Sequence, residues 1–331
     1  MALPTYTDNQ SLIMMESNNP YQSTFILCNT ISISCFTISS VTGNFSQVDK
    51  LWSILPSVYA WMCIIDTRTT IMACLTTLWS VRLTYNFYRR GGYDGWPYNI
   101  FGGEEDYRWE ILRRGTLGGY WTLLTNKYIM VVFNLIFISF YQNWLLLYIA
   151  SPSLVAWSMA MEQNVDANDA DVGAQKFDLS NLNAIDGVAT FLFLFALVIE
   201  SIADNQQYRF QNKKHTLMTT EGFYQGGLFS IVRKPNYAAE QLIWISYYLF
   251  SIAATSAASH SQSKMVWMNW SLGGCILLCL LFQGSGWLTE QISISKYPAY
   301  RDYQRRVGLY VPKASTLWRL LVRNDKRKGS T

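Results

Sequence analysis

YIMVVFNLIFISFYQNWLLLYI, residues 128–149, contains no acidic or basic side chain over 22 positions. A helix needs about 20 mostly apolar residues to cross the hydrocarbon core of a bilayer. A soluble protein would have to bury a helix of this composition on every side. The stretch therefore predicts a membrane-spanning helix, and it anchors the predicted topology of the chain.

The composition of the whole chain agrees with a membrane protein. Half of the 331 residues are hydrophobic and only 15% are charged, whereas charged residues make up roughly 25% of an average soluble domain. Six further apolar stretches bring the number of predicted spans to seven: 22–40, 51–65, 69–88, 185–203, 238–258 and 266–288. We therefore expect an all-α, polytopic membrane bundle of about seven transmembrane helices.

The distribution of Lys and Arg predicts the orientation of this bundle, because basic residues gather on the cytosolic side of membrane proteins. Seven spans place residues 89–127, 204–236 and 289–331 on one face, and these hold 21 of the 26 Lys and Arg residues. The long loop 161–186 falls on the other face and is acidic. We expect the N-terminus outside and the C-terminus in the cytosol.

Cysteine and histidine usage argues against metal or disulfide chemistry. All six cysteines fall within predicted spans, where we expect them to be free, apolar packing residues. Only two histidines are present, too few for a histidine-rich centre. We expect no bound metal and no nucleic-acid partner. The cysteines are Cys28, Cys35, Cys63, Cys74, Cys275 and Cys279.

Carboxylates recur at the inner ends of the last three predicted spans. Glu200 and Asp204 are four residues apart and share one helix face, and the next two spans carry Glu240 and Glu290. Ionisable residues at this depth are rare unless they pair or serve a function. One interpretation is a polar pocket that opens inward and meets the basic loops. The other is that these side chains simply extend to interfacial water.

Four segments carry a resemblance to a known family. On them the chain resembles the steroid 5-alpha-reductase C-terminal superfamily, in particular its DUF1295-type branch, which is related to sterol reductases and isoprenylcysteine carboxyl methyltransferases. The segments are DKLWSILPS at 49–57, EEDYRWEILRR at 104–114, GLFSIVRKPNYAAE at 227–240 and KYPAYRDYQRRVGLYVP at 296–312.

The resemblance implies a single membrane domain over residues 1–331. Residues 22–149 would supply the N-terminal helices, with the loop 91–126 on the substrate side. Residues 185–312 would form the cofactor-binding half, and 313–331 a basic tail that rests on anionic lipid. The resemblance also implies seven helices and a cytosolic C-terminus, as the charge distribution does.

The resemblance further implies NADPH at the cytosolic ends of the last helices. Asn236 and Glu240 match cofactor-contacting residues of the family's motif, and Asp204 matches an Asp of the preceding helix. Where the family's pattern has an arginine, this chain has Gln211, so neighbouring basic residues become the phosphate candidates. The expected cofactor-binding residues are Asp204, Arg209, Arg233, Asn236, Tyr237, Glu240, Glu290, Tyr303, Arg305 and Arg306.

The N-terminal half departs from the family's pattern at the residues that polarise the substrate carbonyl. Ile54 occupies the position of a glutamate and Trp79 that of a tyrosine, so neither can donate a proton. Losing such a donor typically slows a reaction by a factor on the order of 100 to 1000. Any donor must lie elsewhere, and the candidates are Asp49, Tyr59, Tyr85, Asp106 and Tyr107.

Three functions remain open from the sequence. The first is NADPH-dependent reduction at a CH–CH group of a lipid or sterol-like substrate. The second is a non-catalytic membrane subunit that retains the reductase fold. The third is an S-adenosylmethionine-dependent lipid or isoprenylcysteine methyltransferase, although Lys234 replaces a histidine of that signature. We expect membrane lipids, a lipid-like substrate and other membrane subunits as partners. The endoplasmic reticulum is the expected location, with the mitochondrial inner membrane as the alternative.

Overall fold

The computed structural model describes residues 19–94, 105–115, 118–166, 178–217, 222–258, 267–316 and 318. Within these residues the chain is helical throughout and contains no strand beyond one isolated bridge, so the predicted all-α class is confirmed. The chain divides into a first unit, residues 1–188 and 247–274, and a second unit, residues 189–246 and 275–331. The predicted basic tail lies largely outside the described residues, as do parts of the loops 91–126 and 161–186.

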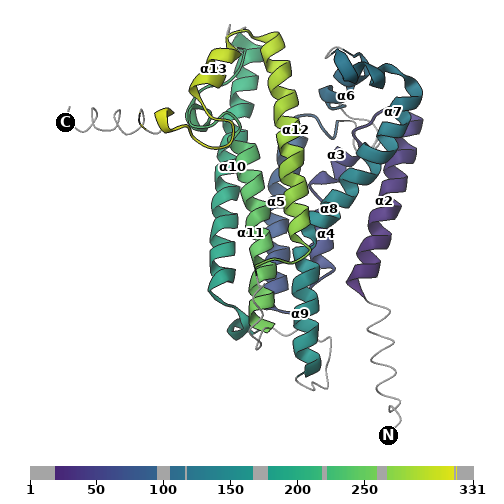
Figure 1. The fold of residues 1–331 in the computed structure, drawn as a ribbon, viewed down its shortest axis with the longest axis vertical. Helices are drawn as coiled ribbons and strands as arrows, with labels where there is room; N and C mark the ends of the chain where they lie inside the picture. Colours follow the sequence, from purple (N-terminus) through teal and green to yellow (C-terminus); the bar gives the residue numbers. More distant parts are fainter. Residues whose placement is uncertain are drawn as a thin grey trace, which may run out of the picture. The chain divides into compact units, whose positions relative to one another are not determined.

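Figure 1 labels the longer helices along the chain. Those whose described residues lie within the first unit are α2 (Pro20–Thr42), α3 (Gln47–Trp52), α4 (Leu55–Trp61), α5 (Thr67–Tyr88), α6 (Tyr107–Arg113), η1 (Gly119–Thr125), α7 (Lys127–Phe133), η2 (Asn134–Tyr141), α8 (Gln142–Ala150), α9 (Pro152–Asp166) and η3 (Leu179–Asn181). Those that belong to the second unit in whole or in part are α10 (Ala184–Leu217), η4 (Gly227–Ser230), α11 (Pro235–Ala258), α12 (Leu272–Lys296) and α13 (Tyr300–Arg306).

Four helices of the described chain are long and apolar enough to cross a membrane: Pro20–Thr42, Lys127–Ala150, Ala184–Lys213 and Leu272–Lys296. The predicted integral membrane character is therefore confirmed, while the count of seven spans stays a prediction. Residues 51–65 form the end of α3 and a separate α4 of 7 residues. Seven residues give about 10 Å of helix, which is too short to cross a bilayer alone. Pro56 explains the break, because proline lacks the N–H that would continue the preceding helix.

The stretch around residues 128–149 forms one continuous helix from α7 through η2 to α8. Asn126 begins it, and its side-chain oxygen accepts from the backbone N–H of Tyr128 at 2.9 Å. The middle section η2 is a π-helix of 8 residues. Such wider turns are rare and occur frequently at functional sites. The apolar run is thus confirmed as a helix of spanning length, with an irregular centre.

α2 packs against η2 and α8 through a face of small side chains (Figure 1). Its buried residues recur every three or four positions, which places them on one side of the helix. They are Pro20, Thr24, Cys28, Ser32, Cys35 and Ser39. A contact across this face joins Asn134 Nδ2 of η2 to Ser39 Oγ at 2.8 Å. All six cysteines of the chain are free, as predicted.

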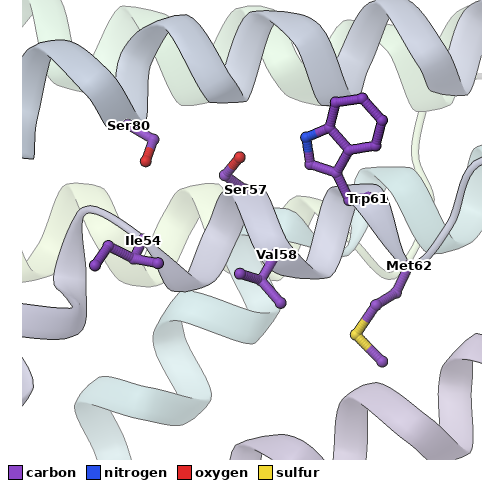
Figure 2. Close-up of a pocket in the computed structure, with 6 residues that line it drawn as sticks. All are labelled: Ile54, Ser57, Val58, Trp61, Met62 and Ser80. Carbon is purple, nitrogen blue, oxygen red and sulfur yellow. The ribbon is translucent and has the colours of Figure 1, made fainter.

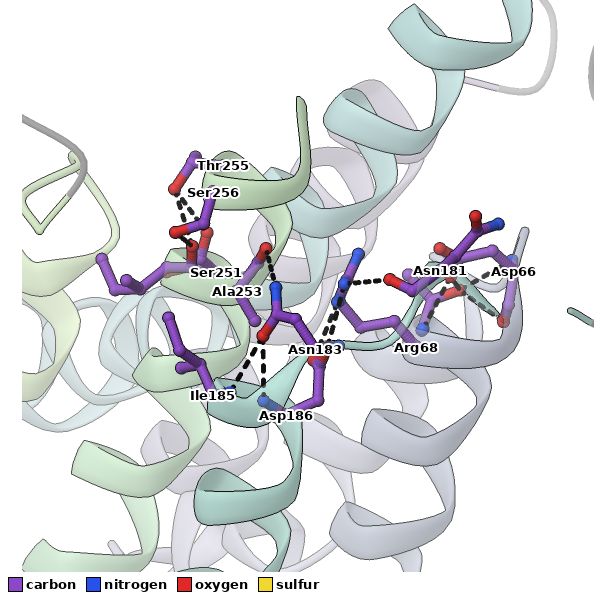
Figure 3. A network of polar contacts seen from close by, with 12 residues as sticks. Asp66, Arg68, Asn181, Asn183, Ile185, Asp186, Ser251, Ala253, Thr255 and Ser256 are labelled. Carbon is purple, nitrogen blue, oxygen red and sulfur yellow. Dashed lines mark hydrogen bonds and ion pairs between the residues drawn. The ribbon is translucent and has the colours of Figure 1, made fainter. Parts of the chain in front are cut away.

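A buried ion pair joins the start of α5 to the start of α10 in the first unit (Figure 3). Arg68 donates from Nε and Nη2 to the two carboxylate oxygens of Asp186, at 2.8 and 2.9 Å. Nη2 also donates to the carbonyl of Asn181 at 2.7 Å, and both charged side chains are only 3% exposed. Asn183 extends the network to α11, since its Nδ2 donates to the Ala253 carbonyl at 3.0 Å. The network fixes three chain segments at one place.

Replacing Arg68 with Met should lower the free energy of unfolding by roughly 3–5 kcal/mol, because Asp186 is left as a buried, unpaired charge. Adding Asp186→Leu should recover part of that loss, because it removes the stranded carboxylate. Arg114→Met is the matched control, since Arg114 and its partner Glu110 are both exposed and such pairs contribute about 0–1 kcal/mol. Unfolding in mixed micelles measures all three variants, and equal losses for Arg68→Met and Arg114→Met would contradict the assignment.

Candidate functional site

The second unit contains a largely buried, bidentate ion pair between Arg233 and Glu290. Arg233, just before α11, donates from Nε to Glu290 Oε1 of α12 at 2.6 Å and from Nη2 to Oε2 at 3.0 Å. Each side chain is 9% exposed. Two more donors reach the same carboxylate, the Tyr300 hydroxyl at 3.1 Å and Gln304 Nε2 at 2.9 Å. Both carboxylate oxygens are therefore supplied with two hydrogen bonds each.

The remaining guanidinium nitrogen of Arg233 holds the end of α13. Its Nη1 donates to the carbonyl of Gln304 at 3.1 Å and to that of Val307. Lys313 Nζ donates to the carbonyls of Gln304 and Arg305, at 3.0 and 2.8 Å. The last carbonyls of a helix have no partner within the helix. Basic side chains satisfy them here and fold the chain after α13 back onto it.

The backbone on either side of Arg233 also pairs with the C-terminal segment. The N–H of Arg233 donates to the Gly308 carbonyl at 2.8 Å, and that of Lys234 to the Leu309 carbonyl at 3.0 Å. A Cβ at Gly308 would lie 1.9 Å from the carbonyl oxygen of Val311, so only glycine fits there. Residues 227–240 and 296–312, far apart in the sequence, therefore form one structure, the clasped segment.

Polar side chains follow the clasped segment into α11. Pro235 begins the helix, and Asn236 and Tyr237 in its first turn are half-buried. Glu240 is buried one turn further on and accepts from Trp244 Nε1 at 2.9 Å. Asn236 and Glu240 are four residues apart and share one face of the helix. The clasped segment thus carries an amide and a carboxylate on one face of its helical part.

α10 contributes two buried carboxylates from its inward face. From residue 189 to 203 its buried residues alternate at spacings of four and three, the pattern of a packed helix face, and Asp204 follows next to the last of them: Ala189, Phe193, Ala196, Glu200, Ala203 and Asp204. The side chain of Gln206 reaches the clasped segment, where its Oε1 accepts from the N–H of Leu228 at 3.0 Å. The acids at 200, 204, 240 and 290 are all buried, so they are not exposed interfacial charges.

The ten predicted cofactor-binding residues differ in how far their side chains are exposed to solvent. Asp204, Glu240, Glu290 and Tyr303 are buried, Arg233, Asn236 and Tyr237 are partly buried, and Arg209, Arg305 and Arg306 are exposed. The ion-pair partners Tyr300 and Gln304 were missed by sequence reasoning. Both belong to the terminal motif at 296–312 and stand four residues apart, a spacing that could have indicated a shared face. The side chain of Lys214 lies outside the described residues.

Two tyrosines of α13 act as fixed hydrogen-bond donors. Burial, followed by the neighbouring Glu290 carboxylate, raises the pKa of Tyr300 well above its usual range. Burial likewise raises the pKa of Tyr303, with Arg233 acting in the opposite direction. Tyr303 donates its hydroxyl to the Phe229 carbonyl at 2.5 Å. Both phenols stay protonated and hold the clasped segment rather than exchanging protons near neutral pH.

In the first unit, the segments around 49–57 and 104–114 are also joined. The N–H of Asp106 donates to Ser46 Oγ at 2.9 Å, and the N–H of Phe45 donates to Glu105 Oε1 at 2.9 Å. Arg113 forms an ion pair with Glu105 and donates to the Gly43 carbonyl at 3.1 Å. The structure therefore brings together two motif segments about 60 residues apart in the chain.

Two of the five candidate proton donors, Asp49 and Asp106, lie close together where these two segments are joined. Burial, and then the charge of Asp106, raise the pKa of Asp49, which accepts weakly from Trp109 Nε1 at 3.5 Å. Burial alone would raise the pKa of Asp106, but the hydrogen bonds and charge of Arg108 outweigh it and lower that pKa. Neighbouring carboxylates with pKa values pushed apart are the usual arrangement of an acid beside a charged partner.

The three tyrosine candidates lie elsewhere. Tyr85 and Tyr107 are exposed, with the Arg89 guanidinium 5.5 Å above the Tyr85 ring. Tyr59 of α4 is buried, and its hydroxyl has no hydrogen-bond partner. Of the three tyrosine candidates, only Tyr59 has a hydroxyl that is shielded from solvent.

The two positions that the resemblance matches to carbonyl-polarising residues carry no acidic side chain. Ile54 lines an open groove of about 380 Å³ between α4 and α5, while Trp79 is fully buried in the core. Figure 2 shows the hydroxyls of Ser57 and Ser80 facing the space between these helices. The other lining residues are Val58, Trp61 and Met62. The groove is thus apolar with two hydroxyls, and suits an acyl or ring surface rather than proton transfer.

Residues 35–307 match the family model described as protein of unknown function DUF1295. An uncharacterized protein of Schizosaccharomyces pombe is 33% identical over 320 residues, which covers 90% of this chain and 81% of that protein. No solved structure matches the chain. Among the described residues, no three His, Cys, Asp or Glu side chains are grouped to hold a metal ion.

Changing Glu290 to Gln should loosen the clasped segment, because Arg233 then loses its charged partner while staying buried. The expected cost is roughly 3–5 kcal/mol, seen as a lower melting temperature and faster trypsin cleavage after Arg305 and Arg306. Asp302→Asn is the control, since Asp302 and Arg305 are exposed and 3.6 Å apart. Cleavage rates equal to those of the control would show that the ion pair does not hold this segment.

The raised pKa of Asp49 predicts a pH-dependent stability. Between its ordinary value of 3.8 and the raised value, the folded state binds more protons than the unfolded state, so stability falls as the pH rises. Asp49→Asn removes this loss, and its melting temperature should exceed that of the wild type increasingly as the pH rises from about 4 to 7. Asp106→Asn should show the opposite trend, because a lowered pKa contributes stability that is lost as the pH falls. Parallel profiles for all three proteins would contradict both assignments.

Proposed function

The chain belongs to the DUF1295 family, and from that premise we propose that it is an integral membrane oxidoreductase that binds NADPH and reduces a lipid-like substrate. The observation that carries the proposal is the clasped segment, which unites 227–240 with 296–312 beside buried carboxylates and exposed arginines of the second unit. Both halves of this structure belong to the segments on which the reductase resemblance rests.

The donor set of the second unit fits a dinucleotide phosphate. Arg209, Arg305 and Arg306 are exposed, and the planar guanidinium of arginine suits the oxygens of a phosphate. S-adenosylmethionine carries no phosphate and has a positive sulfonium, so exposed arginines would not favour it. The methyltransferase alternative is also weakened by Lys234, which stands where that signature has histidine. NADPH is therefore the proposed cofactor.

The proposed roles divide the predicted residues into two groups. Asp204, Asn236, Tyr237 and Glu240 would hold the cofactor with the exposed arginines, because three of them belong to the clasped segment and Asp204 lies on α10, which contacts that segment through Gln206. Arg233, Glu290 and Tyr303 would act as positioning residues, since their polar atoms already bond to protein groups. When bound, NADPH supplies a hydride. The chain's part is to orient the nicotinamide and exclude water from it.

The first unit would contact the lipid-like substrate. The groove at Ile54 offers apolar contact, but none of its lining side chains can act as an acid. Tyr85 and Tyr107 are exposed, and Asp106 is held as a carboxylate by Arg108. Asp49 and Tyr59 are therefore the two proposed donors to the substrate.

The proposed topology keeps seven spans, with the N-terminus outside and the C-terminus in the cytosol. The basic loops after the third, fifth and seventh spans then share the cytosolic face with the proposed cofactor residues, where NADPH is available. We propose the endoplasmic reticulum as the location, and the mitochondrial inner membrane as the alternative.

A second function is favoured by one observation. Both matched carbonyl-polarising positions lack an acidic group, because Ile54 has an alkyl side chain and the indole of Trp79 does not release its proton near neutral pH. A chain that kept the fold and lost the chemistry would show this pattern. The second candidate is therefore a non-catalytic membrane subunit of a larger assembly.

NADPH titration of the purified protein tests the leading proposal, with energy transfer from tryptophan to nicotinamide as the signal. Binding should saturate, and Asn236→Ala and Glu240→Gln should each weaken it by about tenfold, the effect of one lost hydrogen bond. The double change Arg305→Ala with Arg306→Ala should reduce the preference for NADPH over NADH. Arg114→Ala, an exposed arginine of the first unit, should leave both unchanged.

The outcomes distinguish the three functions. Absence of saturable NADPH binding, together with stoichiometric partners in mild detergent, would replace the reductase with the subunit. Binding of S-adenosylmethionine in preference to NADPH would favour the methyltransferase.

A further inference from the structure

The short 3-10 helix η1 of the first unit exposes large apolar side chains on one of its sides. A 3-10 helix repeats every three residues, so positions three apart share a side. Tyr120 and Leu123 form one side, and they are 92% and 57% exposed. Trp121 and Leu124 form the next side, where the first is half-buried and the second is buried. Apolar groups therefore cover the side that faces away from the protein as well as the side that packs against it.

The third side of η1 carries two threonines whose hydroxyls are bonded within the helix. Thr122 Oγ1 donates to the Gly119 carbonyl and Thr125 Oγ1 donates to the Thr122 carbonyl, each at 2.7 Å. Both threonines are exposed. A hydroxyl that is bonded to the backbone of its own helix does not depend on water for a partner. This side of η1 can therefore also enter a region where water is scarce.

η1 comes directly before a helix of spanning length. Only Asn126 separates it from Lys127, where the apolar helix of α7, η2 and α8 begins. That helix has 24 residues and is about 36 Å long, while the hydrocarbon core of a bilayer is about 30 Å thick. The boundary of the bilayer therefore lies near the first turn of α7. Tyr128, an exposed residue of that turn, occupies the depth at which aromatic side chains gather.

The chain folds back as it enters η1. Gly118 and Gly119 have φ angles of 66° and 59°, a left-handed conformation that glycine adopts without strain. η1 contacts both α6 before it and α7 after it. Because η1 lies against the helix that it precedes, its exposed side is close to the level at which α7 enters the bilayer.

We propose that η1 is an interfacial anchor, in which Tyr120 and Leu123 insert into the headgroup region of the leaflet where α7 begins. The partner of this surface is phospholipid. Lys127 is exposed at the start of α7, where an ammonium can meet lipid phosphates. A second copy of the chain is disfavoured as the partner, because one side of a 7-residue helix is far smaller than the roughly 800 Å² that each partner of a stable interface buries.

The anchor also holds the joined segments 49–57 and 104–114 close to the bilayer surface. α6 contacts η1, and it carries Trp109, whose Nε1 donates to Asp49 at 3.5 Å. Asp106 is the N-cap residue of the same helix. Insertion of η1 goes beyond the proposed function, because it needs neither NADPH nor turnover. Failure of the reductase proposal and failure of the anchor are therefore separate results.

Hydroxyl-radical labelling of the wild-type protein in phospholipid nanodiscs, read by mass spectrometry, tests the anchor without any substitution. Tyr120 is 92% exposed and Tyr107 of α6 is 49% exposed. If only protein atoms shielded these rings, radicals formed in water would label Tyr120 more strongly. Insertion reverses the order, so the ratio of Tyr120 labelling to Tyr107 labelling should fall below one. A ratio of one or more would overturn the proposal.

Photo-crosslinking identifies what shields this side. The photoreactive residue p-benzoylphenylalanine is placed at Leu123, at the exposed mid-span position Ile136, or at Glu110 on the exposed charged face of α6. In liposomes of radiolabelled phosphatidylcholine and phosphatidylserine, the Leu123 position should capture phospholipid in a yield close to that of Ile136 and well above that of Glu110. A lipid yield at Leu123 no greater than at Glu110, or crosslinks to a second copy of the chain in place of lipid, would refute the anchor.

Discussion

Arg233 meets Glu290 through two parallel hydrogen bonds, and the same guanidinium reaches the end of α13. A buried ion pair of this kind gives little net stability, because both charges lose their water. The pair instead fixes the geometry of the segments that it joins, because the planar guanidinium determines the direction of its hydrogen bonds as well as their length. The start of α11, the end of α12 and α13 are held by this one side chain. The residues proposed to hold a cofactor stand on the elements that it joins.

A buried ion pair also holds helix ends together in the first unit. Arg68 and Asp186 hold the beginning of α5 against the beginning of α10, while α2 packs through small side chains on η2 and α8. Large, fully buried side chains, among them Trp79, Tyr247 and Phe250, fill the interior of this unit.

Much of the fold could be predicted from composition, because apolar runs of spanning length have few alternatives in a chain this poor in charge. The helix around 128–149, α2 and the free cysteines are examples. The break at 51–65 was missed, because hydropathy does not register the proline that starts α4. The ion-pair partner of Arg233 could not be predicted from the sequence either. Glu290 is 57 residues away, and the acids at 200, 204 and 240 were equally plausible partners.

Hydrogen–deuterium exchange with and without NADPH tests the central claim, that the clasped segment receives the cofactor. The account predicts slower exchange in residues 227–240 and 296–312, and unchanged exchange in the joint around Asp49 and Asp106 of the first unit. Protection of the same residues by S-adenosylmethionine and not by NADPH, or no protection by either, would contradict it.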